Sequence, residues 1–188
     1  MKKYVIASLI ILMLTSCVTF SRKMINDDLL VVKKETISMI DGEYEFNGYQ
    51  YIDPANEKSE KTKNFAGMLD LKNSKILDCD KVILKSTAIK KRKTYEVEFK
   101  FLKNDSVKYS FKYNAILRNG LLLLNNYTLK CHGIPYLLGG CQSFQSRICL
   151  TEQKNLLIQD YYDNSGAALF ILGAGYTINY TEKYKRVQ

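Results

Sequence analysis

The chain has 188 residues, with 28 lysines and arginines against 19 aspartates and glutamates, so its formal net charge is +9 at neutral pH. Residues 17–188 are enough for one domain with a sizeable core but short for two. The positive excess indicates a solvated face, with attraction to anionic lipid or polysaccharide as the functional alternative. His132 is the only histidine, which leaves little scope for histidine-based catalysis.

The first residues have the pattern of a bacterial export signal. Lys2 and Lys3 precede the apolar run Tyr4–Leu14, which as a helix would rise about 16 Å, roughly half of what a bilayer core demands. We therefore expect a signal peptide rather than a membrane-spanning helix. The alternatives are an ordinary signal with a chance cysteine, or a cytosolic protein with an apolar N-terminus.

The four residues Leu14–Cys17 read L-T-S-C, which resembles the lipobox of bacterial lipoproteins. In that class the signal is cut before the cysteine, which carries a diacylglyceryl group and an acylated amino terminus. The resemblance implies a signal peptide over residues 1–16 and a lipid anchor, palmitate among its acyl chains, on Cys17. Several acyl chains hold a protein on a membrane for its lifetime.

Residue 18 bears on which membrane would hold the lipidated protein. In the lipoprotein class an aspartate after the cysteine favours inner-membrane retention in enteric bacteria, so Val18 favours the outer membrane. A Gram-positive source would instead place the protein on the outer face of the plasma membrane. Residues 17–40 are predicted to be the lipidated cysteine and a tether, flexible over Val18–Lys23. Within them Asp27–Ile40 fits a short helix or an early strand.

An all-β domain is predicted over residues 41–188. After Gly42, short runs rich in tyrosine, phenylalanine, valine, isoleucine and threonine alternate with turn residues, and the chain has only two prolines. This spacing is typical of a single antiparallel β-barrel or sandwich.

The strongest structural prediction is a hairpin over residues 94–113. Apolar side chains occupy the odd positions on both sides of Lys103–Asp105, so odd positions must pair with odd positions. A three-residue loop at Lys103–Asp105 satisfies that parity, whereas a two-residue loop would place Phe101 opposite Lys108. The predicted pairs are Leu102 with Ser106, Phe99 with Tyr109, and Glu96 with Lys112.

Further turns are predicted along the chain. Asn119-Gly120 suits a type I′ hairpin turn. The following strand, Leu121–Leu124, must be covered on both faces or expose an apolar outer face. Another turn is expected at Gln153–Asn155. The last apolar segment is expected to bend at Gly173–Gly175.

Four cysteines other than Cys17 permit two disulfides in an exported chain. Cys131, Cys141 and Cys149 lie close together in the sequence, and Cys79 is remote. At least one bridge is expected among the first three, although the connectivity stays open and free buried thiols are the alternative. The spacing around Cys131 and His132 is unlike that of structural zinc sites, so no metal and no cofactor is expected.

Signatures of catalysis are weak. The chain has no G-x-S-x-G motif, zincin motif or P-loop. A pairing of His132 with Cys141 or Cys149 is formally open, as are the carboxylate pairs Asp160 with Asp163 and Asp78 with Asp80. Acidic residues beside turns are usually solvated, so we expect no enzyme. The basic run Lys90–Lys93 is interpreted as a charged turn, and no nucleic-acid partner is expected for an exported protein.

Aromatic residues at alternating positions indicate either a packed core or the lining of an apolar cavity. Gly42-Glu43-Tyr44 is similar to the G-x-W motif of lipocalins, and Gln159–Asp163 resembles their T-D-Y motif. Tyrosine replaces the tryptophan, Gln159 replaces the threonine, and the intervening segment is longer than usual. The resemblance implies an antiparallel barrel with a hydrophobic cavity and names no ligand.

Two functional hypotheses follow. The first is a non-enzymatic envelope lipoprotein that binds a small apolar or amphipathic ligand inside its barrel. The second is a structural or interaction lipoprotein with a filled core, whose outer surface contacts another envelope component. They differ in whether the alternating aromatics line an open cavity or fill a packed interior.

Overall fold

The computed structural model describes residues 20–25, 28–53, 55, 58–59, 61–89, 93–134, 138–168 and 172–187. In chain order its elements are β1 (Leu29–Leu30), the 3-10 helix η2 (Lys34–Ile40), β2 (Gly42–Glu45), β3 (Gln50–Ile52), β4 (Lys58–Ser59), α2 (Phe65–Met68), the 3-10 helix η3 (Ser74–Ile76), β5 (Lys81–Ala88), β6 (Thr94–Lys103), β7 (Ser106–Arg118), β8 (Leu121–Leu124), β9 (Thr128–Ile134), β10 (Leu138–Thr151), β11 (Leu156–Ala168) and β12 (Leu172–Tyr184). No helix among the described residues is long and apolar enough to span a membrane.

The predicted all-β fold is confirmed. The described strands form one antiparallel sheet in the order β2-β5-β6-β7-β8-β10-β11-β12-β3-β4, with β1 and β9 also paired to β10. These strands do not close into a continuous ladder. The sheet nevertheless curls until β2 meets the segment that follows β12, where Tyr44 and Arg186 form an isolated bridge. Two backbone hydrogen bonds flank that bridge, from Glu45 N–H to the carbonyl of Lys185 (2.9 Å) and from Val187 N–H to that of Glu43 (2.8 Å).

The interior of the curled sheet is filled by aromatic side chains. Phe65 of α2 packs against the rings of Phe99, Phe101 and Tyr184, at 4.3 Å between ring centroids for the last pair. The side chain of Asn64 caps this short helix by accepting from the backbone N–H of Gly67 at 2.9 Å. We call the part of the molecule built around this interior the body. Six of its described aromatic residues are at most 1% exposed: Tyr44, Phe46, Phe65, Phe99, Phe101 and Tyr184.

A second, smaller cluster lies on the outer side of the sheet. There Met24 and Ile25 pack with Leu121, Cys149 and Leu157, and all five are at most 6% exposed. The described residues from Phe20 to Ile25 therefore pack against the domain predicted over residues 41–188. The segment Asp27–Ile40, expected to be a helix or a strand, supplies both β1 and η2.

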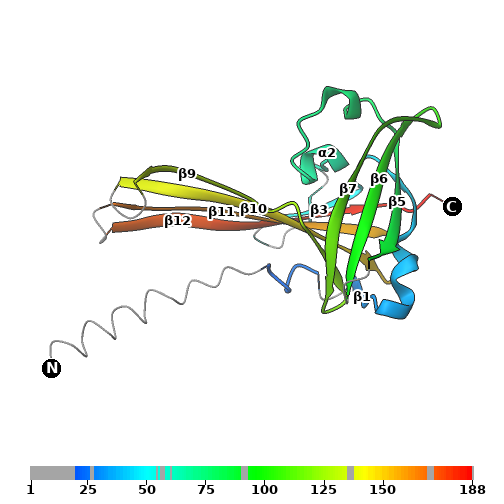
Figure 1. Ribbon diagram of the computed structural model, residues 1–188, viewed down its shortest axis with the longest axis horizontal. Coiled ribbons are helices and arrows are strands. Elements are labelled where there is room, and N and C mark those ends of the chain that lie inside the picture. The colour runs from blue at the N-terminus through cyan, green and yellow to red at the C-terminus, as the bar shows by residue number, and fades with distance from the viewer. Residues whose placement is uncertain are drawn as a thin grey trace.

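One part of the sheet extends away from this body as a four-stranded ribbon, which we call the arm (Figure 1). The arm comprises residues 128–134 of β9, 138–144 of β10, 162–168 of β11 and 172–178 of β12. Its register runs from the row Thr128–Phe144–Tyr162–Ile178 outward to the pairs Leu138–Ile134 and Ala168–Leu172. The arm lies outside the buried core of the body. It is stabilised by the backbone hydrogen bonds between its strands, and small residues allow those strands to approach closely. A Cβ at Gly175, for instance, would come within 2.6 Å of the carbonyl oxygen of Asn164.

The predicted hairpin over residues 94–113 is present, but its loop is different. Lys103 pairs with Ser106, so the turn is the two-residue Asn104-Asp105, with φ of 49° and 58°. The three-residue loop and its pairs were therefore wrong. A β-bulge restores the predicted parity: Leu102 pairs with Val107 and Phe101 with Tyr109, which leaves Lys108 as the extra residue.

From the bulge onward, odd residues do face odd residues. Phe99 lies opposite Phe111, and Glu98 lies opposite Lys112. Glu96 still meets Lys112 diagonally, in an ion pair of 2.6 Å. The parity argument thus holds, while the exact partners shift by two residues because a bulge is invisible in an alternating pattern.

The turn expected at Gln153–Asn155 is present between the end of β10 at Thr151 and the start of β11 at Leu156, and the other two turn predictions have opposite outcomes. Asn119 and Gly120 have φ of 54° and 82° and join Arg118 to Leu121, as a type I′ turn requires. The bend expected at Gly173–Gly175 is wrong, because those residues lie within β12 and pair with Ala167, Gly166 and Ser165. The connection between β11 and β12 falls instead on residues 169–171, outside the described residues.

Candidate functional site

The four cysteines of the domain divide into one pair and two single thiols. Cys131 and Cys141 lie opposite each other on β9 and β10 and form a disulfide within the arm. Cys79 and Cys149 are free and buried. Burial raises the pKa of the Cys149 thiol to about 12 and also raises that of Cys79, so neither is a ready thiolate. Cys17 lies outside the described residues, and its lipidation stays a prediction.

The structure does not bring His132 to a free thiol. Cys141 is occupied by its disulfide, and His132 pairs with Gly140 at an exposed position of β9. Cys149 lies nine residues further along β10, a separation of about 30 Å for an extended strand. The formal Cys–His pairing is therefore not assembled.

The carboxylate pairs are either divided between two faces or exposed. Asp160 and Asp163 point to opposite faces of β11, since side chains alternate along a strand. Asp163 accepts a hydrogen bond from the hydroxyl of Thr177 (2.8 Å). Asp78 and Asp80 are exposed beside the β6–β7 turn, where Asp80 accepts from the backbone N–H of Asn104 (3.0 Å).

The two lipocalin-like segments occupy unlike places. Tyr44 of the first segment is fully buried at the start of β2, and its hydroxyl donates to the carbonyl of Ile40 at 2.8 Å. The same hydroxyl accepts from Arg186, whose guanidinium lies over the tyrosine ring. The second segment, Gln159–Asp163, lies in the middle of β11 where the body passes into the arm.

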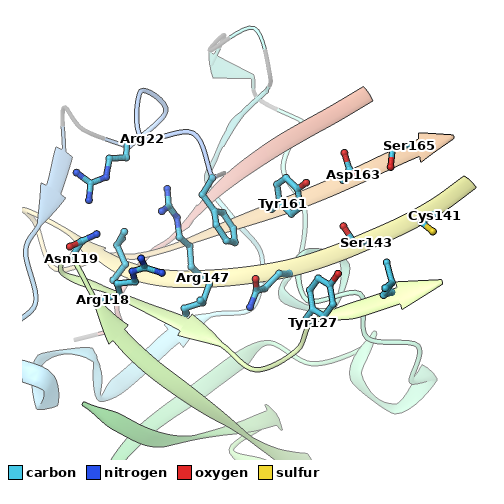
Figure 2. Close-up of a pocket in the computed structure, with 15 residues that line it drawn as sticks. Arg22, Arg118, Asn119, Tyr127, Cys141, Ser143, Arg147, Tyr161, Asp163 and Ser165 are labelled. Atoms are coloured by element: carbon cyan, nitrogen blue, oxygen red, sulfur yellow. The ribbon is translucent and has the colours of Figure 1, made fainter. Parts of the chain in front are cut away.

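An opening of about 630 Å³ lies on the outer side of the sheet. We call it the arginine cleft. It lies between the N-terminal segment, the β7–β8 turn and one face of the arm, and Figure 2 shows the side chains that line it. They are Phe20, Arg22, Arg118, Asn119, Leu121, Leu123, Tyr127, Leu129, Cys141, Ser143, Gln145, Arg147, Tyr161, Asp163 and Ser165.

The strands explain how these side chains meet. Cys141, Ser143 and Arg147 are odd-numbered residues of β10, and Tyr161 and Asp163 are odd-numbered residues of its partner β11, so all five project from one face. In Figure 2 the three arginines gather at one end of the cleft, and Asp163 and Cys141 lie toward the other.

Arg147 is the central charge of the cleft and is only 8% exposed. Its Nε donates to the side-chain oxygen of Gln159 (2.7 Å), its Nη2 donates to the carbonyl of Ser21 (3.2 Å), and its guanidinium lies 4.5 Å from the ring centroid of Phe20. It takes part in none of the ion pairs found among the described residues. Burial, and then the nearby charge of Arg22, lower the pKa of Arg147 to about 10.

Tyr161 forms part of the same wall and is 6% exposed. Its ring packs against Phe20, with 5.7 Å between the centroids. Its hydroxyl lies near Ser143 and Thr177 without reaching hydrogen-bond geometry with any described residue. The cleft therefore contains a nearly buried cation whose N–H donors are only partly used. It also contains a nearly buried hydroxyl that has no hydrogen-bond partner among the described residues.

A second opening of about 430 Å³ lies on the other face of the arm. Phe144, Tyr162, Tyr176 and Tyr180 supply its rings, and Asp160 lies at its edge with one buried carboxylate oxygen, Oδ1, that has no hydrogen-bond partner among the described residues. Burial raises the pKa of Asp160 well above its usual range. The ammonium of a further lining residue, Lys63, lies 4.1 Å from the ring centroid of Tyr180.

Glu182 is a buried acid near the second opening. Its Oε2 accepts from the backbone N–H of Lys63 (3.0 Å), and its Oε1 has no partner among the described residues. Burial raises the pKa of Glu182 to about 7, although the hydrogen bond from Lys63 acts in the opposite direction. No group of three or more histidine, cysteine or acidic side chains in the described part of the chain is arranged to hold a metal ion.

Sequence reasoning missed the arginine cleft. Arg147 has one signal, since it directly precedes the apolar run Ile148–Leu150 and so predicts a charge at the edge of a buried strand. Arg22 and Arg118 carry no such signal, because they come from a presumed tether and from the end of a hairpin. Comparison with protein-family models, curated proteins and solved structures finds no match to the chain.

Proposed function

We propose that the chain is a non-enzymatic lipoprotein of the bacterial cell envelope, anchored by lipid on Cys17, whose β-domain is an interaction module with a filled core. The N-terminal pattern supports the anchor, and Val18 after the cysteine supports the outer membrane as its location. The domain would meet another envelope component through its outer surface, chiefly through the arm.

The filled interior is the observation that carries the choice between the two functional hypotheses. Phe99 and Phe101 are fully buried, and α2 inserts Phe65 between them and Tyr184. The alternating aromatics thus occupy the space in which an internal ligand would lie. This supports the interaction module over a carrier with an apolar cavity.

The arm supports an outward-facing role. Its residues Leu129 and Tyr176 are 56% and 51% exposed, and it extends beyond the body (Figure 1). Apolar and aromatic side chains exposed on a projecting sheet are typical of contact surfaces.

The anchor is tested by Cys17→Ala. We expect the variant to stay unacylated and to be lost from the membrane fraction that holds the wild-type chain, as mass spectrometry and fractionation would report. Cys79→Ala is the matched control, since it removes a cysteine outside the lipobox and should not alter acylation. Acylation that persists in Cys17→Ala would contradict the proposal.

The contact role is tested by photo-crosslinking in cells. A photoreactive residue replaces Leu129 on the arm or Val107 on the body, which are 56% and 54% exposed and so equally accessible. We expect a discrete crosslinked species from position 129 and none from position 107. Equal crosslinking from both positions would argue against the arm as the contact surface.

A further inference from the structure

The arginine cleft combines positive charge with apolar surface. Arg22, Arg118 and Arg147 line one end of it (Figure 2). Half of the remaining lining residues are apolar or aromatic: Phe20, Leu121, Leu123, Tyr127, Leu129 and Tyr161. A volume of about 630 Å³ falls within the range typical of small-molecule sites.

The first step of the argument is the unbalanced charge of Arg147. A buried ion is unfavourable by several kcal/mol unless it is paired and hydrogen-bonded. The described residues offer Arg147 only neutral acceptors, Gln159 and the carbonyl of Ser21. A guanidinium has five N–H donors, so part of its capacity remains for an acceptor inside the cleft.

The second step is the addition of two more guanidinium groups. Arg22 is close enough to lower the pKa of Arg147 by charge repulsion, and both Arg22 and Arg118 are exposed at the cleft. Like charges gathered in one place favour binding of an anion that neutralises them. Guanidinium groups match phosphate oxygens in particular, because they donate two parallel hydrogen bonds.

The third step is the apolar surface beside the charges. Leu129 and Tyr127 are 56% and 52% exposed at the cleft, next to the partly buried Leu123. Asp163 lies at the end away from the arginines and disfavours a second negative charge there. The site is therefore polarised, with an anion end and an alkyl wall.

We propose that the arginine cleft binds an anionic amphiphile, with a phosphate group held by Arg22, Arg118 and Arg147 and an alkyl chain packed against Leu123, Tyr127 and Leu129. The site is distinct from the filled core and does not require the anchor. If Cys17 is lipidated, the membrane surface is near, because Phe20 is three positions beyond it in the chain, a distance of at most about 11 Å. An anionic phospholipid is then the nearest source of such a ligand.

The test is calorimetric titration of the full chain in a nonionic detergent. The probes are dihexanoyl phosphatidylglycerol, zwitterionic dihexanoyl phosphatidylcholine and inorganic phosphate. We expect the phosphatidylglycerol to bind at least tenfold more tightly than either of the others. Equal binding of phosphate and phosphatidylglycerol would indicate a site for a free anion and would overturn the assignment of an amphiphilic ligand. No binding of phosphatidylglycerol would overturn the proposal altogether.

Variants at exposed positions separate the two halves of the site. Arg22→Ser and Arg118→Ser should each weaken phosphatidylglycerol binding about tenfold, as the loss of one charge-assisted contact predicts. Leu129→Asn should weaken the lipid but not phosphate. Lys108→Ser is the matched control, because Lys108 is an exposed base of β7 outside the cleft.

Unchanged binding in both arginine variants, with an unchanged melting temperature, would overturn the assignment of the site. Such a failure is distinguishable from failure of the proposed function. The latter is read from acylation of Cys17, which lies outside the arginine cleft, and from a crosslinked species whose added mass is that of a second protein and not of a bound lipid.

Discussion

The body and the arm are made from the same strands but are stabilised differently. On β11, Ile158 is fully buried in the body, whereas Ser165 is exposed in the arm seven residues further along. The body gains its stability from apolar area removed from water. The arm relies on backbone ladders and on the Cys131–Cys141 disulfide. One strand can therefore begin in a core and end as a projecting surface, provided its partners continue beside it.

The largest expected difference between the two regions concerns a core aromatic. Phe101→Ala should lower the free energy of unfolding by about 3–5 kcal/mol, because it empties space among fully buried rings. Leu129→Ala, the matched change on the arm, should alter it by about 0.5 kcal/mol or less, since Leu129 is already largely exposed. Chemical denaturation measures both, and similar losses would show that the arm contributes a core of its own.

The next effect belongs to the arm. Replacing Cys131 and Cys141 together by serine removes a crosslink between residues ten apart in sequence, worth up to about 3 kcal/mol in the chain-entropy account. We expect faster amide hydrogen exchange in β9 and unchanged exchange in β5, within one molecule. Equal loss of protection in both strands would mean that the arm and the body unfold as one unit.

The smallest expected effect concerns a buried acid of the body. The pKa of Glu182 is raised from 4.5 to about 7 by burial, so between these values the folded state binds more protons than the unfolded state. Stability contributed by the protonated acid is full below about pH 4.5 and is lost as the pH rises through 7. Asp160, also buried with a raised pKa, acts in the same direction.

Glu182→Gln should remove this loss of stability at higher pH. We expect the variant to be more stable than the wild type at pH 8, by an amount on the order of 2 kcal/mol, and to show a flatter stability profile between pH 5 and 8. Denaturation midpoints across that range measure the effect. An unchanged pH profile in Glu182→Gln would assign the dependence to Asp160 instead.

Local features of the fold were predictable where a few neighbouring residues decide them. The type I′ turn at Asn119-Gly120 and the odd-numbered apolar face of β6 are examples. The β6–β7 loop was not, because the bulge at Lys108 permits a two-residue turn without inverting the apolar face. The bend placed at Gly173–Gly175 failed since glycine also serves where strands approach closely.

The candidate site was less predictable than the fold. The aromatics were foreseen as either core or cavity lining, and only their burial decided for core. Arg22, Arg118 and Arg147 come from three separate segments, and no spacing in the sequence links them. Their meeting depends on the N-terminal segment packing across the outer side of β8, β10 and β11.

By itself, the sequence determined the strand-rich character of the chain, the type I′ turn at Asn119-Gly120 and the lipobox-like pattern at Cys17, because each depends on residues close together. The register of β9 and β10 decided which cysteines pair, and tertiary structure alone decided where the N-terminal segment lies and which charges share a cleft. The physical reason is that these contacts join residues far apart in the chain, and only the curl of the sheet and the length of its strands bring them together.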